Sequence, residues 1–470
     1  MLFRNVLTSL ILITFNFVVI YPASALSLKD AVSLAEINDP VFLSAQANLL
    51  ATQARSSQAV ANLLPQISAT ANTTGNHRNY QVRDGSQSSA VDNYNSNGAQ
   101  LSATQPLWHH ANWIAVTQAD KNASQATYQL AAAEQDLLLR LAQAWFDVMS
   151  ARDVVVFSDA QVIATKQQWD QIKRASELGV VNGVAVEEAH AKYDQAVADD
   201  SGAQTDQLIK VAALEQIIGP SVALTLPALN MNYVATDPRS GTFELWLKHA
   251  EEKSPLVLAA LRGFDAASEE IRKQRAGHEP TLDLVANYGR NGQQVGSFPG
   301  QSGFTIVQST VALQLSVPIY SGGGQSAKVA EAMAMQEKAR MDLETAKRNV
   351  LQACRQAWFG WQADNARQTA ALQYLKFSSL NLHSTIQGQS HDLKTELDVL
   401  TARQQVYSAT KDLQKARYDM MMSQLKLKAT AGELVDSDLL AFDAWMVYTK
   451  QASDVLATPQ PEARLSRQVM

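Results

Sequence analysis

The sequence predicts a mainly α-helical fold with a small β part, in which long coiled-coil-like helices and four strands are arranged as two copies of one unit. Three observations support this fold class. The 470 residues contain only 21 Gly and 13 Pro, whereas average usage would give about 33 and 23. The stretch at 107–178 contains neither of these helix breakers, and several motifs recur at a nearly constant offset along the chain. Most of the chain should therefore be regular secondary structure with an internal repeat.

The segment at 1–25 is predicted to be a secretory signal peptide. Arg4 gives a positive start, residues 6–21 are mostly apolar, and Ala-Ser-Ala at 23–25 forms a small-residue cleavage site. A transmembrane anchor is the alternative, which the polar residues inside the apolar stretch disfavour. No later apolar run reaches the ~18 residues that a spanning helix needs. If the exported chain crosses a membrane, it must do so with strands.

Long helices account for most of the remaining sequence. Residues 28–64 and 243–279 are amphipathic, which predicts helices ending at Pro65 and Pro280. The stretch at 107–178 predicts a helix of about 65 residues, roughly 100 Å long. Such helices need partners, and steps of three and four between small or apolar residues indicate two coiled-coil seams. These seams are Val399, Ala402, Val406, Ala409, Leu413, Ala416 and Met420, and Leu343, Ala346, Val350, Ala353, Ala357 and Gly360.

Alternating apolar and small polar residues predict two strands of about ten residues after each of the two prolines. The alternation is clearest at 310–317, and loops rich in Asn, Ser, Gln and Gly are predicted at 75–97 and 289–303. Such strands are typical of a barrel wall between lipid and water. Four strands cannot close a barrel, and open sheet edges are not tolerated in lipid. Several chains must therefore contribute to one barrel. Weaker alternation occurs at 67–72, 101–104 and 282–288.

The near-constant offset indicates an internal duplication. Pro65 of the first half is matched by Pro280 of the second, and the Ala-Trp-Phe run at 144–146 recurs at 357–359. The predicted organisation is a signal peptide at 1–25, a first repeat at 26–219, a linker at 220–242, a second repeat at 243–432, and a final segment at 433–470 with a disordered tail from Thr458.

Composition and motifs argue against several function classes. A net charge of −6 disfavours a nucleic-acid partner, and the single Cys354 allows no thiolate cluster and is expected to be a packed residue. The adjacent His109 and His110 would point to different helix faces, so no metal site is expected there. The Ser-Gly-Gly-Gly-Gln turn at 321–325 lacks the Lys of a phosphate-binding loop. We expect no catalytic residues, no cofactor and no enzyme activity.

The leader, the duplicated helix–strand–strand–helix units and the Pro-Ile-Tyr-Ser-Gly-Gly-Gly run at 318–324 together resemble the outer-membrane efflux protein family, the TolC-like channel-tunnels. The resemblance covers residues 28 to about 442. It implies a homotrimer whose strands form a shared barrel in outer-membrane lipid and whose helices form a periplasmic α-barrel, with 220–242 and 433–450 as an equatorial belt. Further matching stretches lie at 63–66, 144–148, 397–400 and 438–441.

The implied function is a passive exit duct for tripartite efflux or type I secretion. An inner-membrane transporter would energise it through a periplasmic adaptor. The alternative is a periplasmic coiled-coil scaffold or adaptor without a pore, which would also be long-helical. The four alternating strands disfavour this alternative because a scaffold has no use for lipid-facing strands.

The resemblance also implies a periplasmic constriction near the turns that join the helices. Asp398 matches an acidic position of that constriction, and Lys394 matches a basic position that helps to hold it closed. The alternative is that both residues form only an i,i+4 surface pair. Three copies of Asp398 around a narrow passage would favour cations.

Other positions depart from the pattern of the family's constriction. Its second acidic position is Thr401 here, and a glycine of the turn is Asp392. In the first half the acidic position is Ala185, for which the nearby Glu187 and Glu188 could substitute. These residues complete the set of candidates for the gate.

Overall fold

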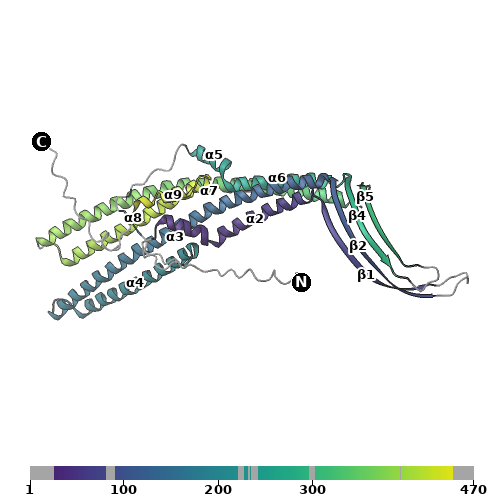
Figure 1. Ribbon diagram of the computed structural model, residues 1–470. Helices are drawn as coiled ribbons and strands as arrows, with labels where there is room; N and C mark the ends of the chain where they lie inside the picture. The colour runs from purple at the N-terminus through teal and green to yellow at the C-terminus, as the bar shows by residue number, and fades with distance from the viewer. Residues whose placement is uncertain are drawn as a thin grey trace.

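The computed structural model describes residues 26–80, 90–220, 227–230, 233, 242–295, 302–391 and 393–447. Figure 1 shows an elongated molecule with a sheet at one end and two reversing helical turns at the other. The prediction of a mainly helical chain with a small β part is confirmed. The predicted signal peptide, most of the 220–242 linker and the tail from Thr458 lie outside the described residues.

The helices of the two halves agree in order and nearly in length. Those of the first half are α1 (Leu28–Asn38), α2 (Pro40–Ala61), α3 (His110–Glu177) and α4 (Gly183–Ile218). Those of the second half are α5 (Phe243–Lys253), α6 (Pro255–Ala276), α7 (Gly324–Ser390) and α8 (Glu396–Thr430). The long helices α3 and α7 contain 68 and 67 residues, as the absence of helix breakers predicts. Among the described helices, none has an apolar segment sufficient to cross a membrane.

The prediction of single helices over 28–64 and 243–279 is wrong. Each stretch is broken into two helices, at Asp39 before Pro40 and at Ser254 before Pro255. Asp39 has φ −69° and ψ 116°, because the ring of a following proline disfavours the helical conformation. Proline then suits the first helical position, where its missing N–H is not needed.

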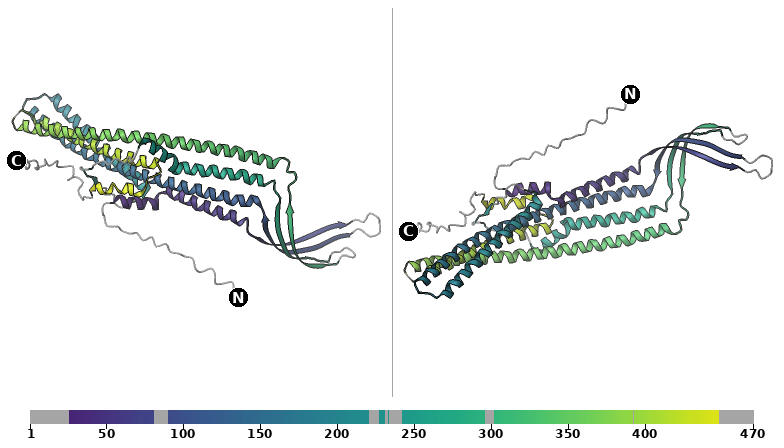
Figure 2. Two further views of the ribbon diagram at one scale, coloured as in Figure 1. Left: turned by 90° about the horizontal axis from the view of Figure 1, so that it is seen from above. Right: turned by 90° about the horizontal axis from the view of Figure 1, so that it is seen from below.

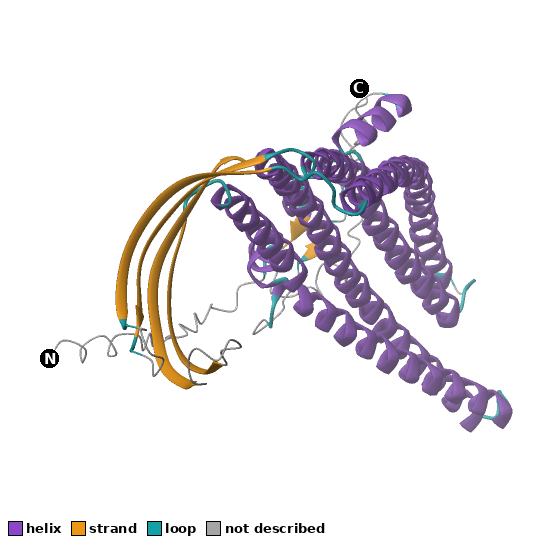
Figure 3. Cartoon of the chain, turned by 90° about the vertical axis from the view of Figure 1, so that its right-hand side faces the viewer, coloured by secondary structure: helices purple, strands orange, loops and turns teal. Residues whose placement is uncertain are grey.

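The described strands form a four-stranded antiparallel sheet with the order β1-β2-β4-β5. Its members are β1 (Gln66–Tyr80), β2 (Ala90–Trp108), β4 (Thr281–Gln293) and β5 (Phe304–Ser316). Strands β1 and β5 lie at its edges, and Figure 3 shows the sheet curved into an arc. A second sheet has two strands, β3 (Ala228–Leu229) and β6 (Met446–Val447). In the chain, β6 follows α9 (Asp436–Leu440) and the 3₁₀ turn η1 (Asp443–Trp445).

The strands are longer than predicted, with 13 to 19 residues each. Much of the predicted loops at 75–97 and 289–303 therefore belongs to strands, which corrects that prediction. Asn76 pairs with Tyr94 in the ladder, and its side-chain amide donates to Ser96 Oγ at 3.0 Å. Such cross-strand hydrogen bonds stabilise strand pairing between polar residues. The strands therefore continue into segments whose composition predicts a loop.

The sheet presents two different faces. On one face Leu284 lies opposite Leu313, and Val311 and Leu315 are 75% and 66% exposed. On the other face Gln100 donates to Asn287 Oδ1 at 3.1 Å. This alternation agrees with the predicted division into apolar and polar sides.

The main hydrophobic core lies at the middle of the molecule, where α1, α9 and the small sheet pack against the long helices (Figure 2). Trp145, Met149 and Met420 are fully buried there. A second buried cluster includes Trp246 of α5 and Cys354 of α7. Burial raises the pKa of the Cys354 thiol, which agrees with the predicted packing role.

Candidate functional site

The candidate site is the end of the molecule farthest from the sheet, where α3 turns into α4 and α7 turns into α8 (Figure 1). The two helical hairpins pack together through α3 and α8. The predicted gate residues that the structure describes fall in or beside these two turns.

The first turn is closed by backbone hydrogen bonds around a glycine. Gly179 has φ +75°, a conformation that favours glycine, and the Val180 N–H donates to Ala175 O at 2.9 Å. Helix α4 then begins after Asn182, whose side-chain oxygen accepts from the Ala185 N–H at 3.1 Å. Ala185 is the third residue of α4, so this position carries a methyl group rather than a carboxylate.

The second turn closes on the last residues of α7. The N–H of Leu393 donates to Gly388 O at 2.9 Å. The Lys394 side chain lies so close to Gly388 that a Cβ added there would be 2.8 Å from Lys394 Cγ. Lys394 is exposed, and Asp392 lies outside the described residues.

Thr395 and Asp398 form a reciprocal capping box at the start of α8. The Asp398 N–H donates to Thr395 Oγ1 at 3.1 Å. Asp398 Oδ2 accepts from the Thr395 N–H at 2.8 Å and from its hydroxyl at 3.0 Å. These bonds, the backbone one first, lower the pKa of Asp398, with a smaller contribution from the charge of Lys394.

Lys394 and Asp398 do not share a helix, although the charge of Lys394 acts on the Asp398 carboxyl. Lys394 precedes the N-cap Thr395, so it lies outside α8 and cannot occupy the same helical face. The sequence prediction overlooked Thr395, although Thr-x-x-Asp before an apolar run is a readable capping signal.

The remaining candidates make local contacts. The Thr401 hydroxyl donates to Leu397 O at 2.9 Å, one turn back on α8. Glu188 pairs with Lys192 at 2.6 Å on α4, and the Lys192 hydrogen bond lowers the pKa of Glu188. Glu187 is exposed beside it. The structure therefore places the described candidates at one end, and among these it is Asp398 that bonds to a residue of the connecting turn.

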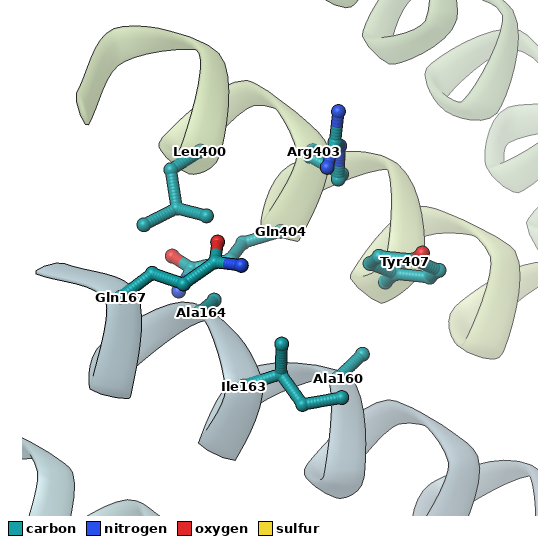
Figure 4. A pocket seen from close by; sticks show the side chains of 8 residues that line it. All are labelled: Ala160, Ile163, Ala164, Gln167, Leu400, Arg403, Gln404 and Tyr407. Carbon is teal, nitrogen blue, oxygen red and sulfur yellow. The ribbon is translucent and has the colours of Figure 1, made fainter. Parts of the chain in front are cut away.

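A groove of about 110 Å³ lies between α3 and α8, on the side of the turns toward the middle of the molecule (Figure 4). Its α3 wall includes Ile163 and Gln167, and its α8 wall includes Leu400, Arg403 and Tyr407. Nearer the middle of the molecule the same two helices are tied together, because Tyr418 of α8 donates to Asp153 of α3 at 2.9 Å. No sequence pattern predicts this contact.

The histidine pair lies at the opposite end, where the sheet meets the helices. His109 contacts Asp283 at 3.0 Å and His110 contacts Glu279 at 2.8 Å. Each histidine thus faces a different carboxylate of the second half. Within the described ranges, no group of three or more His, Cys, Asp or Glu residues could hold a metal ion.

The family profile described as "Outer membrane efflux protein" matches residues 31–220 and 246–433. Outer membrane protein TolC of Escherichia coli (strain K12) is 31% identical over 430 residues, covering 90% of this chain and 85% of that protein. Outer membrane protein TolC of Vibrio cholerae serotype O1 is 30% identical, covering 90% of this chain and 95% of that protein. Proteases secretion protein PrtF of Dickeya chrysanthemi is 28% identical, with coverage of 90% and 92%.

Solved structures share the fold. The crystal structure of the Campylobacter jejuni CmeC outer membrane channel superposes with a TM-score of 0.73 at 14% identity, covering 88% of this chain and 89% of that one.

Proposed function

This chain belongs to the outer membrane efflux protein family, and we propose that it acts as the passive, homotrimeric exit duct of a tripartite efflux or type I secretion system. It is an outer-membrane protein that extends into the periplasm. The observation that carries the proposal is the combination of an open four-stranded sheet with helical hairpins in one chain.

The edges of the molecule support assembly with further copies. The sheet ends in β1 on one side and β5 on the other. The helices next to it contact one another in the order α2-α3-α6-α7, and the helices of the far half in the order α4-α3-α8-α7. One edge of the chain therefore carries β1, α2 and α4, and the other carries β5 and α7. In lipid, the unpaired backbone N–H and C=O groups of an open strand edge must be hydrogen-bonded to a further strand.

Both helical edges carry exposed stripes of small and apolar residues, at steps of three and four on α7 and mainly at steps of seven on α4. On α7, Phe359 and Phe377 are each 57% exposed, and on α4, Val184 and Leu208 are 74% and 70% exposed. Along the α7 stripe three alanines and Gln373 lie between the two phenylalanines, and on α4 a small residue recurs every seven positions while Glu187, Asp194 and Ser201 occupy the alternate positions. The small residues allow close helix approach. The full stripes are Phe359, Ala363, Ala366, Ala370 and Phe377 on α7, and Val184, Ala191, Ala198, Thr205, Leu208 and Ala212 on α4. We assign α4 of one copy to α7 of the next.

The printed names of two relatives support the proposed role in export. PrtF is named for protease secretion, and CmeC for an outer membrane channel. For this chain we propose a periplasmic adaptor and an energised inner-membrane transporter as partners. The periplasmic constriction is assigned to the two hairpin turns, with Asp398 and Lys394 as its charged residues and Thr401, Asp392, Glu187 and Glu188 beside them. The pore-free scaffold is not favoured, since the relatives include outer-membrane channels.

Cross-linking and conductance test this proposal. Cysteines at Leu208 and Ala370, joined by a short bis-maleimide, should give covalent dimers and trimers in outer-membrane fractions. Each single variant should give neither, because the native Cys354 is buried. The purified protein should open discrete channels in planar lipid bilayers. A soluble periplasmic monomer without conductance would contradict the duct.

The domain boundaries are part of the same proposal. Residues 1–25 are assigned to a leader, 26–219 and 243–432 to the two repeats, and 220–242 with 433–470 to the belt and tail. Amino-terminal sequencing of the protein from outer membranes should begin at Leu26. A sequence beginning at Met1 would contradict the leader.

A further inference from the structure

The carboxylate of Asp398 is held by one residue of the connecting turn. Thr395 supplies both donors to Asp398 Oδ2, its N–H at 2.8 Å and its hydroxyl at 3.0 Å. The same hydroxyl accepts from the Asp398 N–H at 3.1 Å. The three bonds close a ring between the turn and the helix, so the carboxylate has one preferred orientation.

Two physical effects favour the ionised form of this carboxylate. Hydrogen bonds donated to a carboxylate stabilise its charge and lower the pKa of the acid, which agrees with the lowered pKa of Asp398. Asp398 also lies in the first turn of α8, where the helix dipole favours a negative charge.

The first hairpin provides an internal comparison. Asn182 caps α4 by accepting from the N–H of Ala185, so the cap is present and the carboxylate is absent. Capping a helix at this turn therefore does not require an acid. The Thr395–Asp398 ring exists in only one of the two hairpins, and it adds one fixed negative charge for each copy of the chain.

We propose that Thr395 is a positioning residue of the constriction, which fixes the orientation of the Asp398 carboxylate and keeps the passage negatively charged and cation-selective at acidic pH. This inference rests on the proposed function, because it needs Asp398 to line the duct. Thr395 acts through Asp398 and need not touch the exported substrate.

Other charged groups lie near this turn. Lys394 lies in the turn itself, and its charge helps to lower the pKa of the Asp398 carboxyl. His391 ends α7 and Glu396 begins α8. On α3, beyond the groove residue Gln167, the next turns toward the hairpin end carry Asp170, Lys173 and Arg174. Any titration attributed to Asp398 must therefore disappear when Asp398 itself is replaced.

The test is the cation-to-anion permeability ratio of purified channels in planar bilayers, measured from reversal potentials in a salt gradient between pH 3 and pH 8. The native channel should lose cation selectivity only at the acidic end. Thr395→Val removes the hydroxyl and keeps the backbone N–H, so the midpoint of this loss should move to higher pH. Thr395→Ser keeps the hydroxyl and should retain the native midpoint.

Two further variants separate the possible outcomes. Asn182→Val removes a helix cap that has no carboxylate partner, so it should leave the midpoint unchanged and controls for loss of capping alone. Asp398→Asn should abolish the acidic transition. If Asp398→Asn leaves the pH profile unchanged, Asp398 does not line the duct and the proposed constriction is wrong. If Asp398→Asn abolishes the transition but Thr395→Val has the native midpoint, the positioning role is overturned.

Discussion

Tyr418 of α8 donates a hydrogen bond of 2.9 Å to the carboxylate of Asp153 on α3, across 265 residues of sequence. Tyr418 and Asp153 are 3% and 8% exposed. Arg152 donates to the other oxygen of the same carboxylate at 3.1 Å. The two helical hairpins are thus joined by a buried polar contact at the level where they leave the central core.

We expect Tyr418→Phe to destabilise the protein by about 1–3 kcal/mol, because it leaves a buried carboxylate oxygen without its donor. The phenyl ring can keep its stack on Phe146, whose centroid lies 5.9 Å away. Chemical unfolding in detergent would measure the loss. Tyr374→Phe is the matched control, since the Tyr374 hydroxyl accepts from Gln405 at an exposed site and should change stability by less than about 0.5 kcal/mol. Equal effects in the two variants would refute this prediction.

Asp153 should make stability depend on pH. Burial raises the pKa of Asp153 above its ordinary value of 3.8, so the folded state binds the proton more tightly than the unfolded chain. The resulting stabilisation is complete below the unfolded pKa and is lost as pH rises through the folded pKa. The Asp153→Asn side chain does not titrate, so the variant does not lose this stabilisation as pH rises. The difference between its unfolding free energy and that of the native protein should therefore shift in favour of the variant between pH 4 and pH 7. A difference that is constant with pH would show that Asp153 does not titrate in this way.

Asp39 has the opposite dependence. The hydrogen bond from Arg140 is the largest cause that lowers the pKa of Asp39, so its contribution is present above the unfolded pKa and is lost as pH falls through the folded pKa. Arg140 donates to both carboxylate oxygens, at 2.8 and 3.1 Å, and Asp39 also caps α2 by accepting from the Phe42 N–H at 2.7 Å.

Asp39→Ala should therefore cost about 2–3 kcal/mol near pH 7, since it removes a cap and a charge-assisted pair. Its effect should shrink in acid. Asp136→Ala is the matched control because Asp136 contacts the same Arg140 at an exposed position, where an ion pair is worth about 0–1 kcal/mol. Urea unfolding at pH 7 and pH 3 distinguishes the two, and a larger loss for Asp136→Ala would contradict the assignment.

Gly432 should tolerate no side chain. It has φ +72°, and an added Cβ would lie 2.5 Å from the carbonyl oxygen of Lys253, at the break between α5 and α6. The left-handed conformation alone costs a residue with a Cβ about 1–2 kcal/mol, and the backbone contact adds to it. Gly360→Ala is the control, because the helical Gly360 has open space around it and alanine favours helices by about 0.5–1 kcal/mol. Thermal unfolding should move in opposite directions for the two variants.

Sequence reasoning succeeded where the signal is local and continuous. The absence of helix breakers predicts α3 because helix formation depends on neighbouring residues. It failed where one local signal outweighs another: Asp39 before Pro40 ends a helix inside an amphipathic stretch, and Asn76 continues a strand in a polar segment. At the candidate site, Asp398 was found through resemblance, whereas Thr395 was readable from its spacing and was overlooked.

The long helices, the four strands, the repeated order of elements and the resemblance to a family of outer-membrane ducts were all readable from the sequence alone. These features follow from periodicity, breaker positions and spacing along the chain. The folded arrangement was needed to show that Asp153 meets Tyr418, that Gly432 lies against Lys253, and that Asp398 is bound by Thr395 rather than paired with Lys394 on a helix. Such contacts depend on how rigid helices of nearly seventy residues are set against one another, and no local pattern encodes that placement.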